Sequence, residues 1–428
     1  MLPRGRLQCS MLAAMSSHPV APEADQEVAP TVDSDVVAPP SVTHTAVRPE
    51  RLLSLDVLRG LTIAFMILVN NQPGPDAFHP LNHAQWNGFT PTDLVFPTFL
   101  FLVGISLVLS TAARISRGVP GGTLLLHMLR RAAVLILFGM VVNTFPFQHL
   151  DAIRFYGVLQ RTGLCYLVAG ALCVLWPGWK GKATVAAACL LGYWALMRFV
   201  PVPGFGVPTH DVVINHPDGN LTACIDRPLF APQHLYQRVR DPEGLLSTLP
   251  AIATTLFGVL TGQWLRTGRT AAQKALGAAT SGLALVLAGL LWNPWFPINK
   301  KLWTSSYVLF AGGLSLLLLA LSIYVVDVLR AGRSGVSRAD RPERPTLYAP
   351  LLVFGTNSIA AYMISELLPG ALELMRTSSG NVLRSYLTWL HRMLPVHGVS
   401  ALLFGMTFVA LTWLLVLPLY RNRIFLRV

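Results

Sequence analysis

The sequence predicts an all-α, polytopic integral membrane protein, and three observations support this. Of the 428 residues, 53% are hydrophobic and only 12% are charged, whereas a soluble domain carries about 25% charged residues. Apolar runs long enough to cross a bilayer, about 17 to 25 residues each, recur along the chain, and polar loops separate them. Because a helix satisfies its backbone hydrogen bonds internally in hydrocarbon, we expect each run to be a transmembrane helix.

About ten such runs predict a helix bundle of about ten transmembrane helices. The count changes by one if residues 382–394 form an interfacial helix. The expected spans are Leu52–Asn70, Thr92–Thr111, Leu124–Phe145, Tyr156–Trp176, Ala183–Phe199, Ser247–Leu265, Ala275–Trp292, Trp303–Val326, Ala349–Leu368 and Val399–Tyr420.

Two polar regions flank or interrupt these spans. Residues 1–50 are rich in Ala, Val, Pro and Ser without any period, which predicts a disordered cytoplasmic tail before a transmembrane domain at 51–428. The loop 201–246 is too long and too rich in turn residues for a plain connector, so we expect it to cover something. We interpret Asp241 and Glu243 in this loop as acids near the positive end of the sixth span.

The net charge of +13 does not indicate a nucleic-acid partner, because of where the basic residues lie. They concentrate in the loops that face the cytoplasm if the N-terminus is cytoplasmic, which is the bias that sets membrane orientation. The loop 71–91 has no Lys or Arg and therefore belongs outside. We expect both termini in the cytoplasm and a multi-pass protein of the bacterial inner membrane, with lipid as its surroundings.

The loop between the first two spans predicts the reaction centre. It holds an imidazole, two carboxamides, an indole and a carboxylate: His83, Gln85, Asn87, Trp86 and Asp93. A plain connector would contain turn residues and little else. These are the groups that polar chemistry at a membrane boundary needs.

His83 is the candidate base or nucleophile, because imidazole titrates near neutral pH. A lone loop histidine is commonly just solvated, and His79 in the same loop is a rival. Asn70, at the end of the first span, can donate to a developing oxyanion. Asp93 either orients His83 or caps the second span, and with Thr90 just before it the cap is favoured.

Several spans contain polar residues, which indicates a polar interior such as an enzyme or a transporter has. Asp56 and Arg59 are three residues apart in the first span, and form either a structural ion pair or a site near a cofactor's phosphates. Gln160 and Arg161 open the fourth span, and Asn357 lies in the ninth. Singly, any of these could serve helix packing.

Metal and disulfide chemistry are not expected. His210, His216 and His234 lack the spacing of a zinc site. Cys224 is the one cysteine in an outer loop, so no pair exists there to form a bridge.

The order of motifs resembles the heparan-alpha-glucosaminide N-acetyltransferase family, including its bacterial relatives. Arg51–Gly60 (RLLSLDVLRG) resembles the opening of several membrane acyltransferase families, while Met66–Asn70 and His83–Pro97 are more specific. The similarity runs from about residue 50 to 428. Later segments that agree are Gly157–Arg161, Asp241–Thr248, Asn299–Tyr307, Gly355–Ser358 and Arg423–Phe425.

The resemblance implies transfer of acetyl from cytosolic acetyl-CoA, as co-substrate, to the amine of a terminal glucosamine on the far side of the membrane. The family's active-site histidine falls on His83 and its assisting asparagine on Asn70. The expected acceptor of a bacterial-type member is an amino sugar of peptidoglycan or chitin. Transfer in one step and transfer through an acetyl-histidine both remain open. We assign Trp86, Asn87 and Asp93 to substrate binding, and Arg59, Gln160, Arg161 and Asn357 to acetyl-CoA binding.

Two other functions stay open. A transporter of amino sugars or cell-wall precursors would also need about ten helices and a polar interior, together with helix breaks at corresponding places in two halves. A membrane O-acetyltransferase of a surface glycan would share the early motif and differ in its acceptor. A homodimer is a further open possibility, whereas an inert scaffold would have no use for the polar groups.

Overall fold

The computed structural model describes residues 52–73, 77–148, 150–329, 347–377, 380–394 and 396–426. The expected disordered tail and most of the arginine-rich stretch 330–350 lie outside these residues. Helices make up most of the described chain, and its two short strands, β1 (Arg376–Thr377) and β2 (Gly380–Asn381), pair antiparallel in one hairpin.

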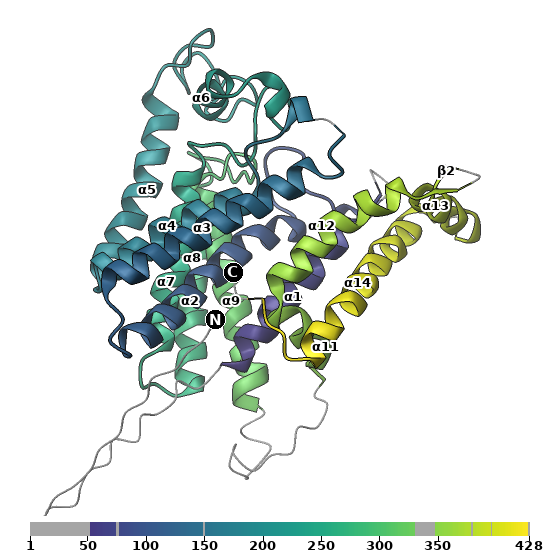
Figure 1. Cartoon of the computed structure of the whole chain (residues 1–428). Helices are drawn as coiled ribbons and strands as arrows, with labels where there is room; N and C mark the ends of the chain where they lie inside the picture. Colours follow the sequence, from purple (N-terminus) through teal and green to yellow (C-terminus); the bar gives the residue numbers. More distant parts are fainter. Residues whose placement is uncertain are drawn as a thin grey trace, which may run out of the picture. The chain divides into compact units, whose positions relative to one another are not determined.

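Each predicted span contains a long helix, and the ninth contains a bent pair (Figure 1). The helices form where apolar runs lack internal turn signals, and they end at polar or proline-containing loops. They are α1 (Leu53–Asn70), α2 (Val95–Ile115), α3 (Gly121–Thr144), α4 (Val158–Leu175), α5 (Trp179–Phe199), α7 (Thr248–Leu265), α8 (Ala271–Trp292), α9 (Ser305–Ser322), α11 (Ala349–Thr356), α12 (Ser358–Leu374) and α14 (His397–Arg421).

The chain is a polytopic helical membrane protein. Within the described residues, 7 helical segments are long and apolar enough to cross a bilayer, and the bent pair makes up to 8. The other two predicted spans, α5 and α7, are full-length helices but fall outside that set. They are more polar, since α5 begins with Lys180 and Lys182 and α7 carries three internal threonines. The total of ten spans therefore stays a prediction.

Helix α2 lies at the centre of the bundle, with 72% of its most apolar window buried, whereas the corresponding share is 22% for α3 and α8. Glycines allow the closest helix contacts. Gly104 of α2 meets Gly258 of α7 backbone to backbone, and a side chain at either position would collide with the other helix. The outer helices α3 and α8 instead expose leucines such as Leu137 and Leu287, as expected of a lipid-facing surface.

The ninth predicted span is broken. Helices α11 and α12 meet at an angle of 86°, and Asn357 between them has a non-helical conformation (φ −124°, ψ 44°). Gly355 packs against the backbone of Asp56 in α1 with no room for a side chain, which fixes α11 against α1. The chain therefore changes direction at Asn357, just after the point where Gly355 fixes α11 against α1. Helix α12 then packs along α1, and its Glu366 reaches Asn70 at the C-terminal end of α1.

Shorter elements fill the polar segments. The amphipathic helix α13 (Val382–Met393) confirms a helix in residues 382–394. Near the cavity described below lie the 3-10 turns η2 (His79–Leu81) and η3 (Pro91–Leu94), and a π-helical turn, η6 (Ile323–Val328), extends α9. The long segment 201–246 contains α6 (Leu221–Leu229) and the turn η5 (Pro232–His234), and it packs on Tyr193, Met197 and Phe296.

Candidate active site

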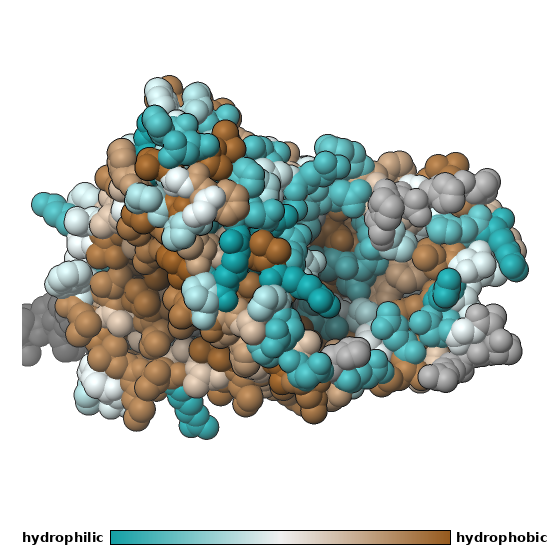
Figure 2. Space-filling view, turned by 90° about the horizontal axis from the view of Figure 1, so that it is seen from above, coloured by the Kyte–Doolittle hydropathy of each residue, from teal (hydrophilic) through white to brown (hydrophobic). Residues whose placement is uncertain are grey.

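A cavity of about 410 Å³ lies on the side of the bundle that carries α6. Figure 2 shows this face, where hydrophilic side chains gather around a hollow. Segments far apart in sequence supply its walls, and the 201–246 segment forms one of them, as expected of a covering loop. The lining residues are Asn70, His83, Ala84, Trp86, Asp93, Val142, Asn143, Arg154, Val158, Tyr236, Gln237, Pro242, Glu243, Lys300, Lys301, Tyr362 and Glu366.

Asp93 is the anchor of the first loop. Its Oδ2 accepts hydrogen bonds from the backbone N–H of Thr90 (3.0 Å), the Thr90 hydroxyl (3.1 Å) and the backbone N–H of Ala84 (3.1 Å). These bonds form a capping box at the start of η3, which leads directly into α2. Oδ1 is thereby aimed at His83, so Asp93 performs both of the roles that the sequence allowed.

His83 is held by this carboxylate. Its Nδ1 lies 2.8 Å from Asp93 Oδ1, and its side chain is 47% exposed while that of Asp93 is 1% exposed. We assign the imidazole proton to Nδ1, because that nitrogen faces a buried carboxylate. Nε2 then carries the lone pair that a general base or a nucleophile requires.

Lys300 is the cation beside this pair, and the sequence interpretation did not select it as a site residue. Its Nζ lies 3.0 Å from Nδ1 and 3.3 Å from Nε2 of His83, and 3.7 Å from Asp93 Oδ1. Burial lowers the pKa of the Lys300 ammonium, although the charge of Asp93 opposes this shift. A cation in this position can stabilise negative charge that develops on an oxygen near His83.

The opposite wall comes from α1 and α12. Asn70 ends α1, and its Nδ2 donates to Oε1 of Glu366 at 3.2 Å. Tyr362, one turn before Glu366 on α12, also lines the cavity. The structure therefore brings Asn70 and His83, predicted to act together, to the walls of one cavity.

An apolar recess of about 140 Å³ continues from this cavity between α1, α2 and α4. Asn70, His83 and Lys300 line both spaces, whereas Met66, Phe96 and Phe99 line the recess alone. His83 consequently stands at the junction between a polar chamber and an apolar pocket among the helices. A small acyl group fits the apolar side of such a junction, and a sugar fits the polar side.

Comparisons with known proteins identify the family of the chain. Residues 51–291 match the family model "Heparan-alpha-glucosaminide N-acetyltransferase, catalytic". The chain belongs to this family. It is 32% identical to the heparan-alpha-glucosaminide N-acetyltransferase of Mus musculus over 334 residues, covering 65% of this chain and 50% of the mouse protein. For the Homo sapiens protein the identity is 30% over 352 residues, covering 69% of this chain and 52% of the human protein.

The chain thus spans about half the length of these two relatives. The part matched by the acetyltransferase family model includes Asn70, His83 and Asp93, whereas Lys300 and Glu366 lie beyond residue 291. His79, the rival of His83, is exposed in η2 and is not among the residues that line the cavity.

Trp86 lines the cavity, and two residues of the segment 201–246 hold its side chain in place. Its Nε1 donates to the carbonyl oxygen of Asn215 at 2.8 Å, and the Arg240 guanidinium lies 4.8 Å from its ring centre. Asn87 does not line the cavity. Its Oδ1 accepts from Nδ2 of Asn215 (2.5 Å) and of Asn299 (3.1 Å), so it ties this loop to two others.

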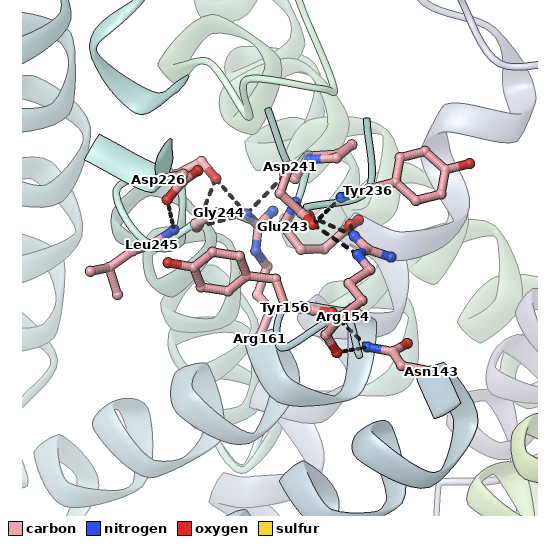
Figure 3. A network of polar contacts seen from close by, with 12 residues as sticks. Asn143, Arg154, Tyr156, Arg161, Asp226, Tyr236, Asp241, Glu243, Gly244 and Leu245 are labelled. Atoms are coloured by element: carbon pink, nitrogen blue, oxygen red, sulfur yellow. Dashed lines mark hydrogen bonds and ion pairs between the residues drawn. The ribbon is translucent and has the colours of Figure 1, made fainter. Parts of the chain in front are cut away.

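Arg154 organises the wall formed by the long segment (Figure 3). It binds Asp241 through two hydrogen bonds of 2.8 and 2.6 Å and contacts Glu243 at 2.5 Å. Although burial opposes it, these two carboxylates raise the pKa of Arg154. The interpretation of the acids as a helix start is wrong, because α7 begins only at Thr248 and both acids pair with Arg154.

The same network supplies an aromatic surface. The Tyr236 ring lies over the Arg154 guanidinium, 4.7 Å from ring centre to Cζ, and its backbone N–H donates to Asp241. Asn143, at the end of α3, donates to the carbonyl oxygens of Arg154 and Tyr156 and so holds the connecting loop. The exposed Tyr236 ring lines the cavity, as do the side chains of Trp86 and Tyr362.

Gln160 and Arg161 lie behind this wall, outside the lining of the cavity. Arg161 is fully buried, and its Nη2 donates to the carbonyl oxygen of Pro242 at 2.9 Å and contacts the Ser247 hydroxyl. Gln160 packs against Gly139 and donates to the Met140 sulfur. In the described residues, Gln160 therefore links α4 to α3, and Arg161 links α4 to the segment just before α7.

Arg59 and Asn357 belong to a different neighbourhood. Arg59 pairs with Asp56 at 2.8 Å, and it also donates to the carbonyl oxygen of Gly355 and to Ser106. Asn357 accepts from the backbone N–H of Leu426. Since helices rise 1.5 Å per residue, Arg59 lies about 16 Å along α1 from Asn70. The four residues assigned to acetyl-CoA therefore form two separate groups.

Proposed function

We propose that this protein is a transmembrane N-acetyltransferase that moves acetyl from cytosolic acetyl-CoA to the amine of a glucosamine-type sugar on the periplasmic side. The observation that carries the proposal is the position of His83, which is oriented by Asp93 at the junction of a polar cavity and an apolar recess. Membership of the acetyltransferase family supports the same reaction class.

The proposed topology has ten spans, both termini in the cytoplasm and a location in the bacterial inner membrane. Several of the residues that line the cavity come from the C-terminal ends of α1 and α3 and from the N-terminal ends of α2 and α4, or from the loops beside them. Alternating helix directions place these ends on one side. Since the loop 71–91 lacks Lys and Arg, the positive-inside rule favours the periplasmic side for the cavity.

In the proposed reaction the acetyl thioester lies in the apolar recess and the sugar amine lies in the polar cavity. Nε2 of His83 removes a proton from the amine, which forms the new C–N bond while the C–S bond breaks. Alternatively, Nε2 accepts the acetyl group first and the amine takes it in a second step. Asn70 and Lys300 stabilise the negative charge on the carbonyl oxygen, and the proton leaves with the thiol of coenzyme A.

For the sugar, we propose that Trp86 and Tyr236 provide the aromatic surfaces. Both rings line the cavity, and each has a guanidinium group 4.7 to 4.8 Å from its centre. The described residues contain one observation in favour of a transporter instead, which is the break between α11 and α12. A transporter of amino sugars would move its ligand without consuming acetyl-CoA, so an acetylation assay separates the two functions.

The test is acetylation by the full chain in detergent, with labelled acetyl-CoA and a panel of amino sugars and neutral sugars. Wild-type protein should label an amino sugar, and His83→Ala should lower the rate about 10²- to 10⁴-fold. His79→Ala is the matched control and should retain the rate. Unimpaired acetylation by His83→Ala, or labelling of neutral sugars in place of amines, would contradict the proposal.

A further inference from the structure

Glu366 differs from the other acidic residues that line the cavity. Asp93 lies 3.7 Å from the Lys300 ammonium, and Glu243 lies 2.5 Å from the Arg154 guanidinium. Among the described side chains, Glu366 has one polar partner, the neutral amide of Asn70 at 3.2 Å. Glu366 is therefore a cavity carboxylate without a cation beside it in the described part of the chain.

Such a carboxylate is costly where it lies. Glu366 belongs to α12, the longer half of the bent pair that is apolar enough to enter a membrane. A charged side chain in a membrane helix costs a few kcal/mol or more, and it normally faces a cavity and pairs with an opposite charge. Since Glu366 lines the polar cavity, the missing partner can be a ligand that carries a positive charge.

The amine of an amino sugar is such a group, because its protonated form is the single charge on an otherwise neutral molecule. The position also suits the reaction. Glu366 lines the polar cavity only, whereas Tyr362, one turn away, and Asn70 line both the cavity and the recess. A sugar whose ammonium group binds Glu366 thus lies next to Asn70 and Tyr362. These two residues also line the recess, which His83 lines as well.

We propose that Glu366 binds the ammonium group of the acceptor and makes the cavity select amino sugars over neutral sugars. This inference rests on the proposed function for the identity of the acceptor class. The role of Glu366 is binding and selection. The bound ammonium group releases one proton to water to become the attacking amine, and His83 removes the second proton during acetyl transfer.

The experiment measures binding, without acetyl-CoA. Isothermal titration of the full chain in detergent at pH 6.5 compares glucosamine with glucose, which lacks the amine. The variant Glu366→Gln removes the charge while its carbonyl oxygen still accepts a hydrogen bond from Asn70. The matched control is Glu373→Gln, since Glu373 is exposed on the same helix and is not among the residues that line the cavity.

Wild-type protein and Glu373→Gln should bind glucosamine more tightly than glucose. Glu366→Gln should raise the Kd for glucosamine at least about tenfold, which corresponds to losing one charge-assisted hydrogen bond, and should leave the Kd for glucose unchanged. The wild-type preference should also fall as the pH rises and the amine loses its proton.

An unchanged preference for glucosamine in Glu366→Gln, or no preference in wild-type protein, would overturn the inference. These outcomes are separate from failure of the proposed function. A protein that prefers glucosamine through Glu366 but never acetylates it would keep the ammonium site and lose the acetyltransferase assignment.

Discussion

The two walls of the cavity are built differently. The wall that holds His83 is densely cross-linked, because Asp93 accepts hydrogen bonds from two backbone amides and a hydroxyl and also binds the imidazole. On the wall from α1 and α12, the described residues of the two helices share one hydrogen bond between side chains, from Asn70 to Glu366. A reacting group has to be held in one geometry, whereas a group that binds a ligand can leave its hydrogen-bonding positions free for that ligand.

The strongest test of this contrast is Asp93→Asn. Asparagine can keep the capping contacts, but it offers its amide or its oxygen to Nδ1 without a charge, so the tautomer and the basicity of His83 change. We expect acetyl transfer to fall about 10²- to 10⁴-fold with little loss of folded protein, measured by initial rates and by thermal unfolding. A rate within a few-fold of wild type would mean that Asp93 only caps η3.

Arg154→Met tests whether the wall from the long segment depends on a single cation. It leaves the fully buried carboxylate of Asp241 without its cation, which should destabilise the protein by about 3 to 5 kcal/mol. The measurement is the thermal unfolding midpoint in detergent. Arg238→Met, at an exposed position in the same segment, is the control, and equal midpoints for both variants would refute the role of Arg154.

Lys300→Met removes the cation beside His83 and should lower the acetylation rate about 10²- to 10³-fold. This is the effect that removing one hydrogen-bond donor to a developing oxyanion has in other enzymes. The pH profile adds a second readout. Because burial lowers the pKa of Lys300, wild-type activity should fall as the pH rises through that lowered value. Lys300→Arg should keep its charge and extend activity to higher pH. An identical alkaline decline in Lys300→Arg would assign the titration to another group.

The smallest expected effect concerns Asp226, behind the wall in Figure 3. Burial raises its pKa from 3.8 to about 6, and the charge of Asp241 adds to the shift while the Leu245 amide opposes it. Between about pH 4 and 6 the folded chain keeps a proton that the unfolded chain has released, so stability falls as the pH rises through this interval.

Asp226→Asn removes that titration. Relative to wild type it should gain stability at pH 7.5, by at most about 3 kcal/mol for a shift of this size, and the gain should disappear near pH 4. Thermal unfolding midpoints across this range provide the measurement. A difference between the two proteins that does not vary with pH would contradict the account of Asp226.

The sequence predicted the helices because their signal is local. Each apolar run lies between polar loops, and the structure places a long helix in every one of them except the ninth, which holds the bent pair of α11 and α12. The relation between His83 and Asp93 was also within reach, since the two residues are ten positions apart in one loop. Local spacing was therefore enough to predict that His83 and Asp93 could meet.

The rest of the site depends on packing between distant segments. Lys300 is 217 positions from His83, and Glu366 is 296 positions from Asn70. Nothing in the periodicity of the chain says that α12 turns at Asn357 and lies along α1. One signal was available in the sequence. A glutamate inside an apolar helix is costly unless it faces a cavity or a partner, and Glu366 is such a residue in the predicted ninth span.

In the proposed function, transfer at His83 carries acetyl from a donor on one side of the bilayer to an amine on the other. It is tested most directly with purified protein in sealed liposomes that hold acetyl-CoA inside and glucosamine outside only. N-acetylglucosamine should form in the outer solution with wild-type protein and with His79→Ala, and none above background should form with His83→Ala. Product that forms only when both substrates are on the same side of the membrane would contradict it.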